Sequence, residues 1–349
     1  MTQIYLIRHG EAEGNIFRRL HGQYDSLLTP RGHMQVECVK KRFENIHIDA
    51  CYASDLTRAS LTSRSIYLPK GLEVHRDSRF RELQVGRWED LPYGYMYRFE
   101  REDLRCFDAN PPAWHVDGSE RFDDYTQRFL EGMVEAAQAY DGGTVAIFAH
   151  GAVIRGTLMR LFFMDDITKL PYSDNTGVSK LTYHQGTFTY EFLNDNSHLP
   201  QNQTSRYVRR WWQKTGNRDE ADLYHLPAEQ VKLPGELALR DTDRSCTVIA
   251  AMMVDKPVGV IRLGTAEDGV GNILGIDLLP EYHGRYYGDQ ILGCAYSHFR
   301  KLGCKALRAA AGEYPDDVLN RYCFDPVTRS RSIDTTVFDW RPANEKIGP

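Results

Sequence analysis

Residues 4–10 read IYLIRHG, a short apolar run that ends on an arginine, a histidine and a glycine. Residues 146–151, AIFAHG, likewise end an apolar run on a histidine and a glycine. Short apolar runs bounded by such residues predict buried strands. In α/β sheets, ligands bind at the carboxyl ends of strands beside helix N-termini, and a glycine there lets a ligand approach the backbone closely. We therefore expect His9 and His150 to stand together at one ligand site.

The first two hundred residues alternate strand-like runs with helical periods around these two strands. Helices are predicted to begin after Thr29 and after Asp55, because both residue types cap helices, and a longer helix is predicted over residues 122–140. A hairpin is predicted to turn at Gln185 and Gly186. This pattern is typical of an α/β domain with a mostly central sheet.

A polar stretch at residues 194–204, NDNSHLPQNQT, lacks periodicity, so the domain boundary is placed there. The first domain is predicted to span residues 1–199 and the second residues 205–349. Residues 206–214 are expected to form an amphipathic helix. A second α/β pattern follows. Its predicted elements are a hairpin over residues 246–263, a strand over 272–279, a helix over 288–302 and a strand over 305–310.

The composition excludes several classes of protein. The 349 residues include 43 Lys and Arg against 48 Asp and Glu, a formal net charge of −5, which argues against nucleic acid as a partner. No apolar run approaches the roughly 18 residues of a membrane span, and no secretory h-region precedes Arg8. Seven scattered cysteines without a C-x-x-C pair indicate reduced thiols, so we expect a cytoplasmic location. The sequence carries no signal of oligomeric state.

Further motifs join the two histidines in a consistent order and spacing. They are Arg8-His9-Gly10-Glu11 with Asn15, His21-Gly22, Leu28-Thr29 before Gly32, Ser54 to Ala59 with Arg58, Arg81-Glu82-Leu83, Trp88-Glu89, Gly118-Ser119-Glu120 and Ala149-His150-Gly151. Over residues 1–199 this set resembles the histidine phosphatase superfamily, also called the phosphoglycerate mutase-like family. The resemblance implies a three-layer α/β/α fold. Two details depart from the family pattern, namely His21 in place of the commoner Gln and the order Gly-Ser-Glu in place of Gly-Glu-Ser.

The chemistry of phosphoryl transfer explains these residue types. A phosphoryl group in transfer carries spread negative charge, and the planar guanidinium groups of Arg8 and Arg58 suit its oxygens. Their charges also disfavour protonation of His9, so its ring keeps a lone pair that can attack phosphorus and form a phosphohistidine. Glu82 is expected to protonate the leaving alkoxide and then to take a proton from water. His150 is expected to donate a hydrogen bond to the phosphoryl oxygens.

The predicted catalytic residues are therefore His9, Glu82 and His150, and the predicted phosphate-binding residues are Arg8, Asn15, His21, Gly22 and Arg58. No metal or other cofactor is expected in this domain. The histidines lack the short spacing of zinc sites, and an arginine beside the nucleophile would repel a cation.

Hydrolysis of a small phosphorylated metabolite is the activity we expect. The segment over the site, residues 91–116, is short and rich in aromatic residues, and a domain of this length looks like the phosphatase branch of the family more than the longer glycolytic mutases. Two alternatives stay open. One is phosphoglycerate mutase-type transfer, which would use the same pocket, and the other is a regulatory or binding protein that keeps the folds without turnover.

The second domain resembles the GNAT acetyltransferases, which implies a smaller α/β domain. Residues 275–280, GIDLLP, followed by YHGRYYG and a predicted helix, are similar to that family's acetyl-CoA-binding segment. The resemblance implies acetyl-CoA contacts at Leu278, Gly284, Arg285 and Gly288. The loop departs from the family because His283 stands where Gln or Arg is usual and Tyr286 where Gly is usual. A degenerate module that only binds a partner or stabilises the first domain is the alternative.

Overall fold

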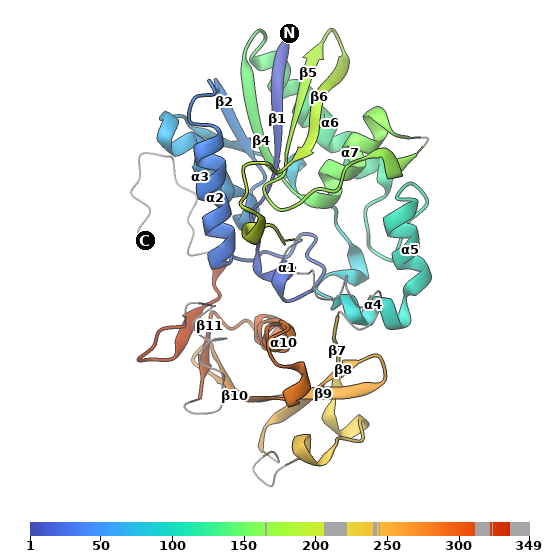
Figure 1. Ribbon diagram of the computed structural model, residues 1–349, viewed down its shortest axis with the longest axis vertical. Coiled ribbons are helices and arrows are strands. Elements are labelled where there is room, and N and C mark those ends of the chain that lie inside the picture. Colours follow the sequence, from blue (N-terminus) through green and yellow to red (C-terminus); the bar gives the residue numbers. More distant parts are fainter. Residues whose placement is uncertain are drawn as a thin grey trace.

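The computed structural model describes residues 1–164, 166–205, 222–239, 243, 245–310, 322 and 324–335. These residues form two six-stranded sheets, one in each half of the chain, with helices packed against them (Figure 1). The helix expected at residues 206–214 lies outside the described residues.

The first sheet has the strand order β3-β2-β4-β1-β5-β6. Its strands are β1 (Thr2–Arg8), β2 (Ala50–Ala53), β3 (Val74–Arg76), β4 (Thr144–Ala149), β5 (Val178–His184) and β6 (Thr187–Asp195). The first four strands in this order are parallel, whereas β5 runs antiparallel to β1 and pairs with β6. The β5–β6 hairpin turns at Gln185 and Gly186 as predicted, and both residues have positive φ, of 45° and 82°. That conformation is the one a two-residue hairpin loop requires.

Helices cover both faces of this sheet (Figure 1). They are α2 (Pro30–Arg42), α3 (Thr57–Lys70), α6 (Phe122–Ala139) and α7 (Gly151–Phe162). Successive side chains of a strand point to opposite faces, so Ile4 and Leu6 pack with α6 and α7, and Tyr5 and Ile7 pack with α2 and α3. The three-layer α/β/α prediction is confirmed.

The predicted capping residue is right for α2 and wrong for α3, although α3 begins two residues after Asp55. The Thr29 hydroxyl accepts the Gly32 N–H at 3.0 Å and caps α2 as expected. Asp55 does not cap α3, because its carboxylate binds Arg81 instead, with Arg81 Nε at 2.7 Å. The first N–H of α3, at Thr57, is bound at 2.9 Å by Asp25, which comes from a loop far away in the sequence.

The second sheet has the order β12-β11-β10-β9-β8-β7. Its strands are β7 (Tyr224–Pro227), β8 (Thr247–Met253), β9 (Lys256–Glu267), β10 (Val270–Leu278), β11 (Ala306–Ala309) and β12 (Ser330–Ser332). Only β10 and β11 are parallel, and they pair over the first half of β10 alone. Helix α10 (Tyr287–Lys301) packs its apolar face, including Ile291 and Phe299, against this sheet. A smaller α/β domain of the GNAT type thus follows the first.

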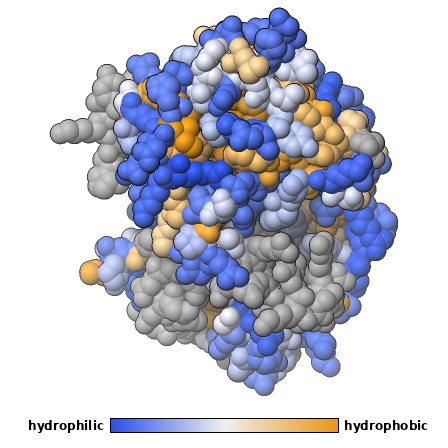
Figure 2. All heavy atoms as spheres, turned by 45° about the horizontal axis from the view of Figure 1, so that its top comes forward, coloured by the Kyte–Doolittle hydropathy of each residue, from blue (hydrophilic) through white to orange (hydrophobic). Residues whose placement is uncertain are grey.

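Shorter elements link these parts. The helices are α1 (Glu13–Ile16), α4 (Tyr93–Phe99) and α5 (Arg101–Ala109), and the 3-10 turns are η1 (Ser78–Phe80), η2 (Gly86–Trp88), η3 (Ile167–Lys169), η4 (Gln201–Gln203), η6 (Ala228–Gln230), η7 (Gly235–Leu237) and η9 (Pro280–Tyr282). Helix α1 contacts α10 across the boundary between the domains (Figure 1). Among the described helices, none combines the length and the apolar character needed to cross a bilayer. In Figure 2 most of the coloured surface is hydrophilic, with apolar side chains in a band across the first domain.

Candidate active site

His9 and His150 lie side by side at the carboxyl edge of the first sheet. Strands β1 and β4 are parallel neighbours with Arg8 opposite Ala149, and the His9 N–H donates to the Ala149 carbonyl at 2.9 Å. The centres of the two imidazole rings are 5.2 Å apart, and the two residues are 1% and 0% exposed. The register of one parallel strand pair therefore brings the two histidines together.

The hydrogen bond of His9 determines which ring nitrogen holds the lone pair. Nδ1 lies 2.7 Å from the carbonyl oxygen of Gly10. A carbonyl only accepts, so Nδ1 donates, and the neutral ring keeps its lone pair on Nε2. Burial, followed by the charges of Arg58 and Arg8, lowers the pKa of His9 well below its usual value. His9 is thus a neutral imidazole at neutral pH, with Nε2 as its nucleophilic atom.

His150 carries the opposite tautomer. Its Nδ1 lies 3.2 Å from Nε of Arg58, which can only donate, so this Nδ1 accepts. Burial and the Arg58 charge lower the pKa of His150 well below its usual value, and the neutral ring then bears its proton on Nε2. This Nε2 is buried and has no hydrogen-bond partner among the described residues. A buried donor in that state is satisfied by a ligand or water.

The charges of both predicted phosphate-binding arginines act on His9. Arg58 is fully buried, and its Nη atoms donate to the carbonyls of Gly22 at 2.7 Å and Tyr24 at 3.0 Å. Arg8 donates from Nη1 to the Ser173 carbonyl at 2.7 Å, while its buried Nε has no partner within the described part of the chain. A Cβ at Gly151 would stand 3.1 Å from this Nε, so glycine gives Arg8 its space.

Asn15 and His21 bind one another beside His9. The Asn15 Oδ1 accepts the Ala12 N–H at 3.0 Å, which leaves Nδ2 to donate to His21 Nε2 at 3.0 Å. The ring centres of His21 and His9 are 5.6 Å apart. Burial, then the charges of Arg58 and Arg8, lowers the pKa of His21 well below its usual value. Within the described residues, no three His, Cys, Asp or Glu side chains are grouped as a metal site.

Gly22 lies in a loop whose carbonyls bind Arg58 and whose N–H groups bind Glu89. The Glu89 carboxylate accepts the N–H groups of Gly22 at 2.7 Å and Gln23 at 2.9 Å. Burial raises the pKa of this carboxyl although the backbone N–H groups oppose the change. The Gly22 N–H is therefore occupied, and this residue reaches the site through the carbonyl that binds Arg58.

The Glu82 carboxyl group binds the N-terminus of α7, the helix that directly follows His150. Its Oε1 accepts the Val153 N–H at 2.8 Å and the Leu83 N–H at 3.0 Å, and Oε2 accepts the Ala152 N–H at 3.0 Å. All three contacts use Glu82 as an acceptor and fix the position of its carboxyl group.

The sequence analysis missed several residues that support this site. Asn175 is fully buried and donates from Nδ2 to the His9 carbonyl at 3.1 Å and to Asn15 Oδ1 at 3.2 Å. The Thr62 hydroxyl accepts the Gly10 N–H at 3.0 Å. The available signals were an Asn-Thr-Gly run just before the strand of residue 178 onward, and a threonine one helical turn after Arg58.

The residues expected to contact acetyl-CoA lie together in the turn between β10 and α10. Leu278 ends β10, Gly284 has a φ of 74° in open space, and Gly288 is in the first turn of α10. Arg285 is exposed in the same turn. The His283 ring lies 2.9 Å from the Leu278 carbonyl and fastens the turn to the strand.

Two side chains in this turn do not fit the pyrophosphate of acetyl-CoA. Tyr286 keeps a left-handed backbone with a φ of 61°, a conformation that costs a non-glycine residue about 1–2 kcal/mol, and it adds a side chain where the resemblance expects glycine. Asp289, in the first turn of α10, is 1% exposed and accepts the Tyr322 hydroxyl at 2.5 Å. A carboxylate there repels a phosphate at the helix N-terminus.

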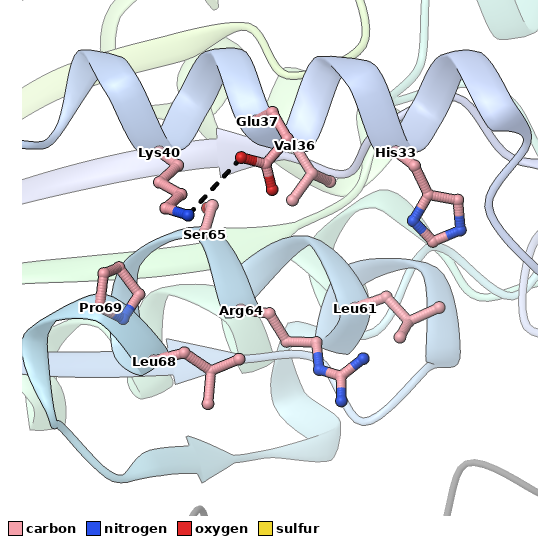
Figure 3. Close-up of a pocket in the computed structure, with 9 residues that line it drawn as sticks. All are labelled: His33, Val36, Glu37, Lys40, Leu61, Arg64, Ser65, Leu68 and Pro69. Atoms are coloured by element: carbon pink, nitrogen blue, oxygen red, sulfur yellow. Dashed lines mark ion pairs between the residues drawn. The ribbon is translucent and has the colours of Figure 1, made fainter. Parts of the chain in front are cut away.

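A separate hollow lies between α2 and α3 (Figure 3). Its cavity volume is about 490 Å³, and basic and apolar side chains line it, among them His33, Arg64 and Leu61. In Figure 3 Lys40 and Glu37, three residues apart on α2, form an ion pair at its edge, with a separation of 3.6 Å. None of the predicted phosphate-site residues lines this hollow, so it is distinct from the site around His9.

Comparison with known proteins agrees with the fold of the first domain. The three-layer domain is of the phosphoglycerate mutase-like class. Residues 4–196 match the model of the histidine phosphatase superfamily (branch 1), more than half of the chain, so the chain belongs to this superfamily. Residues 205–321 match the acetyltransferase (GNAT) family.

Individual relatives cover the first domain. A probable phosphoglycerate mutase GpmB of Enterobacter sp. (strain 638) is 28% identical over 211 residues, which are 57% of this chain and 95% of that protein. The solved structure of Bacillus stearothermophilus YhfR has a TM-score of 0.53 and 30% identity, covering 57% of this chain and 99% of that one. The structure of the mycobacterial glucosyl-3-phosphoglycerate phosphatase has a TM-score of 0.51 and 23% identity, and the match covers 56% of this chain and 99% of that one. At this identity the match shows a similar fold.

Proposed function

We propose that the first domain is a metal-independent phosphomonoester hydrolase that acts through a phosphohistidine on His9. The observation that carries this proposal is the pair of opposite tautomers at the carboxyl edge of the sheet. His9 presents a lone pair on Nε2, and His150, with its ring centre 5.2 Å away, presents an N–H without a partner among the described residues. A nucleophile beside a donor suits a phosphoryl group, which accepts on its oxygens and is attacked at phosphorus.

The first half of the reaction transfers the phosphoryl group to the enzyme. His9 Nε2 attacks phosphorus, a P–N bond forms and the ester P–O bond breaks, and the leaving alkoxide takes a proton from Glu82. In the second half, Glu82 takes a proton from water, the water oxygen bonds to phosphorus and the P–N bond breaks. The products are the free alcohol and inorganic phosphate, and both residues return to their starting states.

The positive charges around the two rings support binding of a doubly charged phosphate ester. Arg8 offers the buried Nε that has no partner in the described part of the chain, and His150 offers its Nε2–H. Arg58 adds a fully buried charge beside them. Preorganised donors in a dry site stabilise the developing charge most effectively in the transition state. A small phosphorylated metabolite is therefore the substrate class we assign.

Hydrolysis of p-nitrophenyl phosphate by the full chain tests the proposal. We expect turnover in the presence of EDTA, inhibition by vanadate, and loss of turnover in the variant His9→Ala. His33→Ala is the matched control, because that histidine lines the hollow between α2 and α3. Activity that disappears on chelation, or that survives in His9→Ala, would reject this mechanism.

Mutase chemistry is the second candidate, because the matched relatives bear the name probable phosphoglycerate mutase. A mutase returns the phosphoryl group from the histidine to the bound product instead of to water. Incubation with a monophosphoglycerate distinguishes the two by product analysis. Release of inorganic phosphate supports hydrolysis, whereas the isomeric phosphoglycerate without free phosphate would establish the mutase.

We infer that the second domain keeps the GNAT fold without that family's nucleotide cradle. The inference follows from Tyr286 and Asp289 in the turn before and within α10. Calorimetric titration of the full chain with acetyl-CoA is expected to give no binding heat. A saturable heat that is lost on substitution of Gly288 by a bulky residue would overturn it.

A further inference from the structure

Residues 11–27, here called the site segment, connect His9 to the start of α2 and carry three of the predicted phosphate-site residues, Asn15, His21 and Gly22. The carbonyls of Gly22 and Tyr24 also accept hydrogen bonds from the buried guanidinium of Arg58. The position of both the asparagine amide and the arginine therefore depends on where this segment lies.

The middle of the site segment packs against the second domain. Phe17 is 3% exposed, and its ring centre is 4.8 Å from that of Tyr296 and 5.2 Å from that of Tyr322. Ile16 and Phe17 belong to the apolar core of the second domain rather than to the cores of the first. A Cβ added at Gly293 of α10 would stand 2.5 Å from the Phe17 Cβ, so the two backbones meet closely here.

Ion pairs fasten the same stretch from the second domain. Glu13 is 2% exposed, and its Oε1 lies 2.7 Å from Nη2 of Arg331. Arg18 binds Asp222 through two hydrogen bonds of 2.6 and 2.8 Å. Removing one partner of a buried pair leaves the other charge uncompensated, which makes such pairs strong positional constraints.

Helix α1 links these contacts to the phosphate site. Helix α1 has four residues and begins at Glu13. Asn15 is its third residue, and Phe17 directly follows its last residue. While its neighbours contact the second domain, the Asn15 side chain binds His21 and Asn175 in the first. A single helical turn does not persist alone, because nucleation is unfavourable. The geometry of α1 therefore comes from the surfaces that hold it on both sides.

We propose that the second domain is a positioning element of the phosphate site, acting through Phe17 and the Glu13–Arg331 pair. This proposal rests on the function proposed above. The second domain makes no substrate contact in this role. Asn15, His21 and the Arg58 guanidinium take up their places because the second domain holds α1 and the residues beside it.

Two unrelated substitutions in the second domain test this in the full chain. Arg331→Met removes the nearer arginine partner of Glu13 and leaves Arg300, whose Nη2 lies 3.9 Å from Glu13 Oε2, and Gly293→Val pushes against Phe17. Arg331→Lys retains the charge and is the conservative rescue. Arg98→Met is the matched control, because Arg98 makes another cross-domain pair, with Asp255 at 2.6 Å, which is exposed and does not touch the site segment.

The measurements are kcat/KM, the inhibition constant of vanadate and hydrogen exchange of a peptide over residues 11–27. We expect Arg331→Met and Gly293→Val to lower kcat/KM and to raise the inhibition constant of vanadate, each by about 10- to 100-fold, because small misplacements of binding groups cost factors of this size. Exchange of the peptide should quicken in both. Arg331→Lys should lose less, and Arg98→Met should stay within about two-fold of the wild type, as exposed pairs contribute little.

Simple destabilisation gives a different result, because a smaller folded fraction lowers the maximal rate but leaves the vanadate constant unchanged. Wild-type vanadate constants in both Arg331→Met and Gly293→Val would overturn the inference. A wild-type chain that neither turns over phosphate esters nor binds vanadate would instead reject the proposed function. Unchanged hydrogen exchange over residues 11–27 would in that case overturn the positioning role as well.

Discussion

Replacing His150 by asparagine and by glutamine separates the two hydrogen bonds of its ring. In the native chain Arg58 Nε donates to His150 Nδ1 at 3.2 Å. The oxygen of the asparagine amide reaches the place of Nδ1 and can still accept this bond, but no atom remains at the place of Nε2. The glutamine amide reaches the place of Nε2 and can still donate there, while Arg58 Nε loses its acceptor. The proposed mechanism needs the donor, and the fold needs the acceptor.

The variant with the larger expected loss of kcat is not the one with the larger expected loss of stability. Loss of one preorganised donor to a developing charge costs about 100- to 1000-fold in kcat, so His150→Asn should fall by this factor and His150→Gln by much less. Loss of the partner of a buried donor costs about 1–3 kcal/mol, so His150→Gln should be the less stable variant by about that amount. Activity and stability should therefore rank the two variants in opposite orders.

Steady-state hydrolysis of p-nitrophenyl phosphate and urea unfolding of the same preparations measure both rankings. The comparison is internal, since both variants remove the imidazole and both keep an amide. Equal losses of kcat in the two variants, or a His150→Asn enzyme with wild-type kcat, would refute the assignment of the Nε2–H to the phosphoryl oxygens.

Three further outcomes follow from the same contacts. Because the pKa of His9 is well below 6.5, kcat/KM should stay level as the pH falls from 7 to 6.5, and an acid limb centred at or above 6.5 in the pH profile would contradict this. The pKa values of His9, His21 and His150 are lowered in the folded chain, so in the unfolded chain these residues take up protons first as the pH falls; these three alone should lower the free energy of unfolding by about 4 kcal/mol between pH 7.0 and 5.5, measured by urea unfolding. Thr29→Ala removes the cap of α2 and a 2.7 Å bond to Glu11, and should lower the unfolding free energy by about 1–2 kcal/mol in the same assay.

The sequence was sufficient for the elements whose signals are local. His9 and His150 each follow an apolar strand, and parallel neighbours place their carboxyl ends at the same edge, so their meeting could be predicted. The cap at Thr29 and the turn at Gln185 were equally readable, since hydroxyl caps and hairpin turns depend on a few adjacent residues. Asp55 shows the limit of such signals, because a distant arginine took its carboxylate and Asp25 supplied the cap.

Contacts between distant segments could not be predicted in this way. The sequence marked Glu89 as part of a motif but did not predict its partners. Its carboxylate binds the N–H groups of residues 22 and 23, which lie more than sixty residues earlier in the chain. Asn175 likewise reaches the His9 carbonyl from beyond β4. Neither contact has a spacing in the sequence that a periodic pattern would show.

The apolar pair Ile16 and Phe17 gives the second domain a role that its own turn does not. Side chains of this kind in a loop beside a polar site would be exposed if residues 1–199 stood alone, and burying such a side chain is worth about 1.5–3 kcal/mol. In the whole chain both are part of the second core, and Glu13 finds a buried partner there. Under the positioning proposal, the second sheet is needed beside the phosphate site for its contact with α1, even though Tyr286 and Asp289 do not suit the acetyl-CoA expected of a GNAT-like domain. A substitution in α10 that disturbs this contact is then expected to alter phosphate binding.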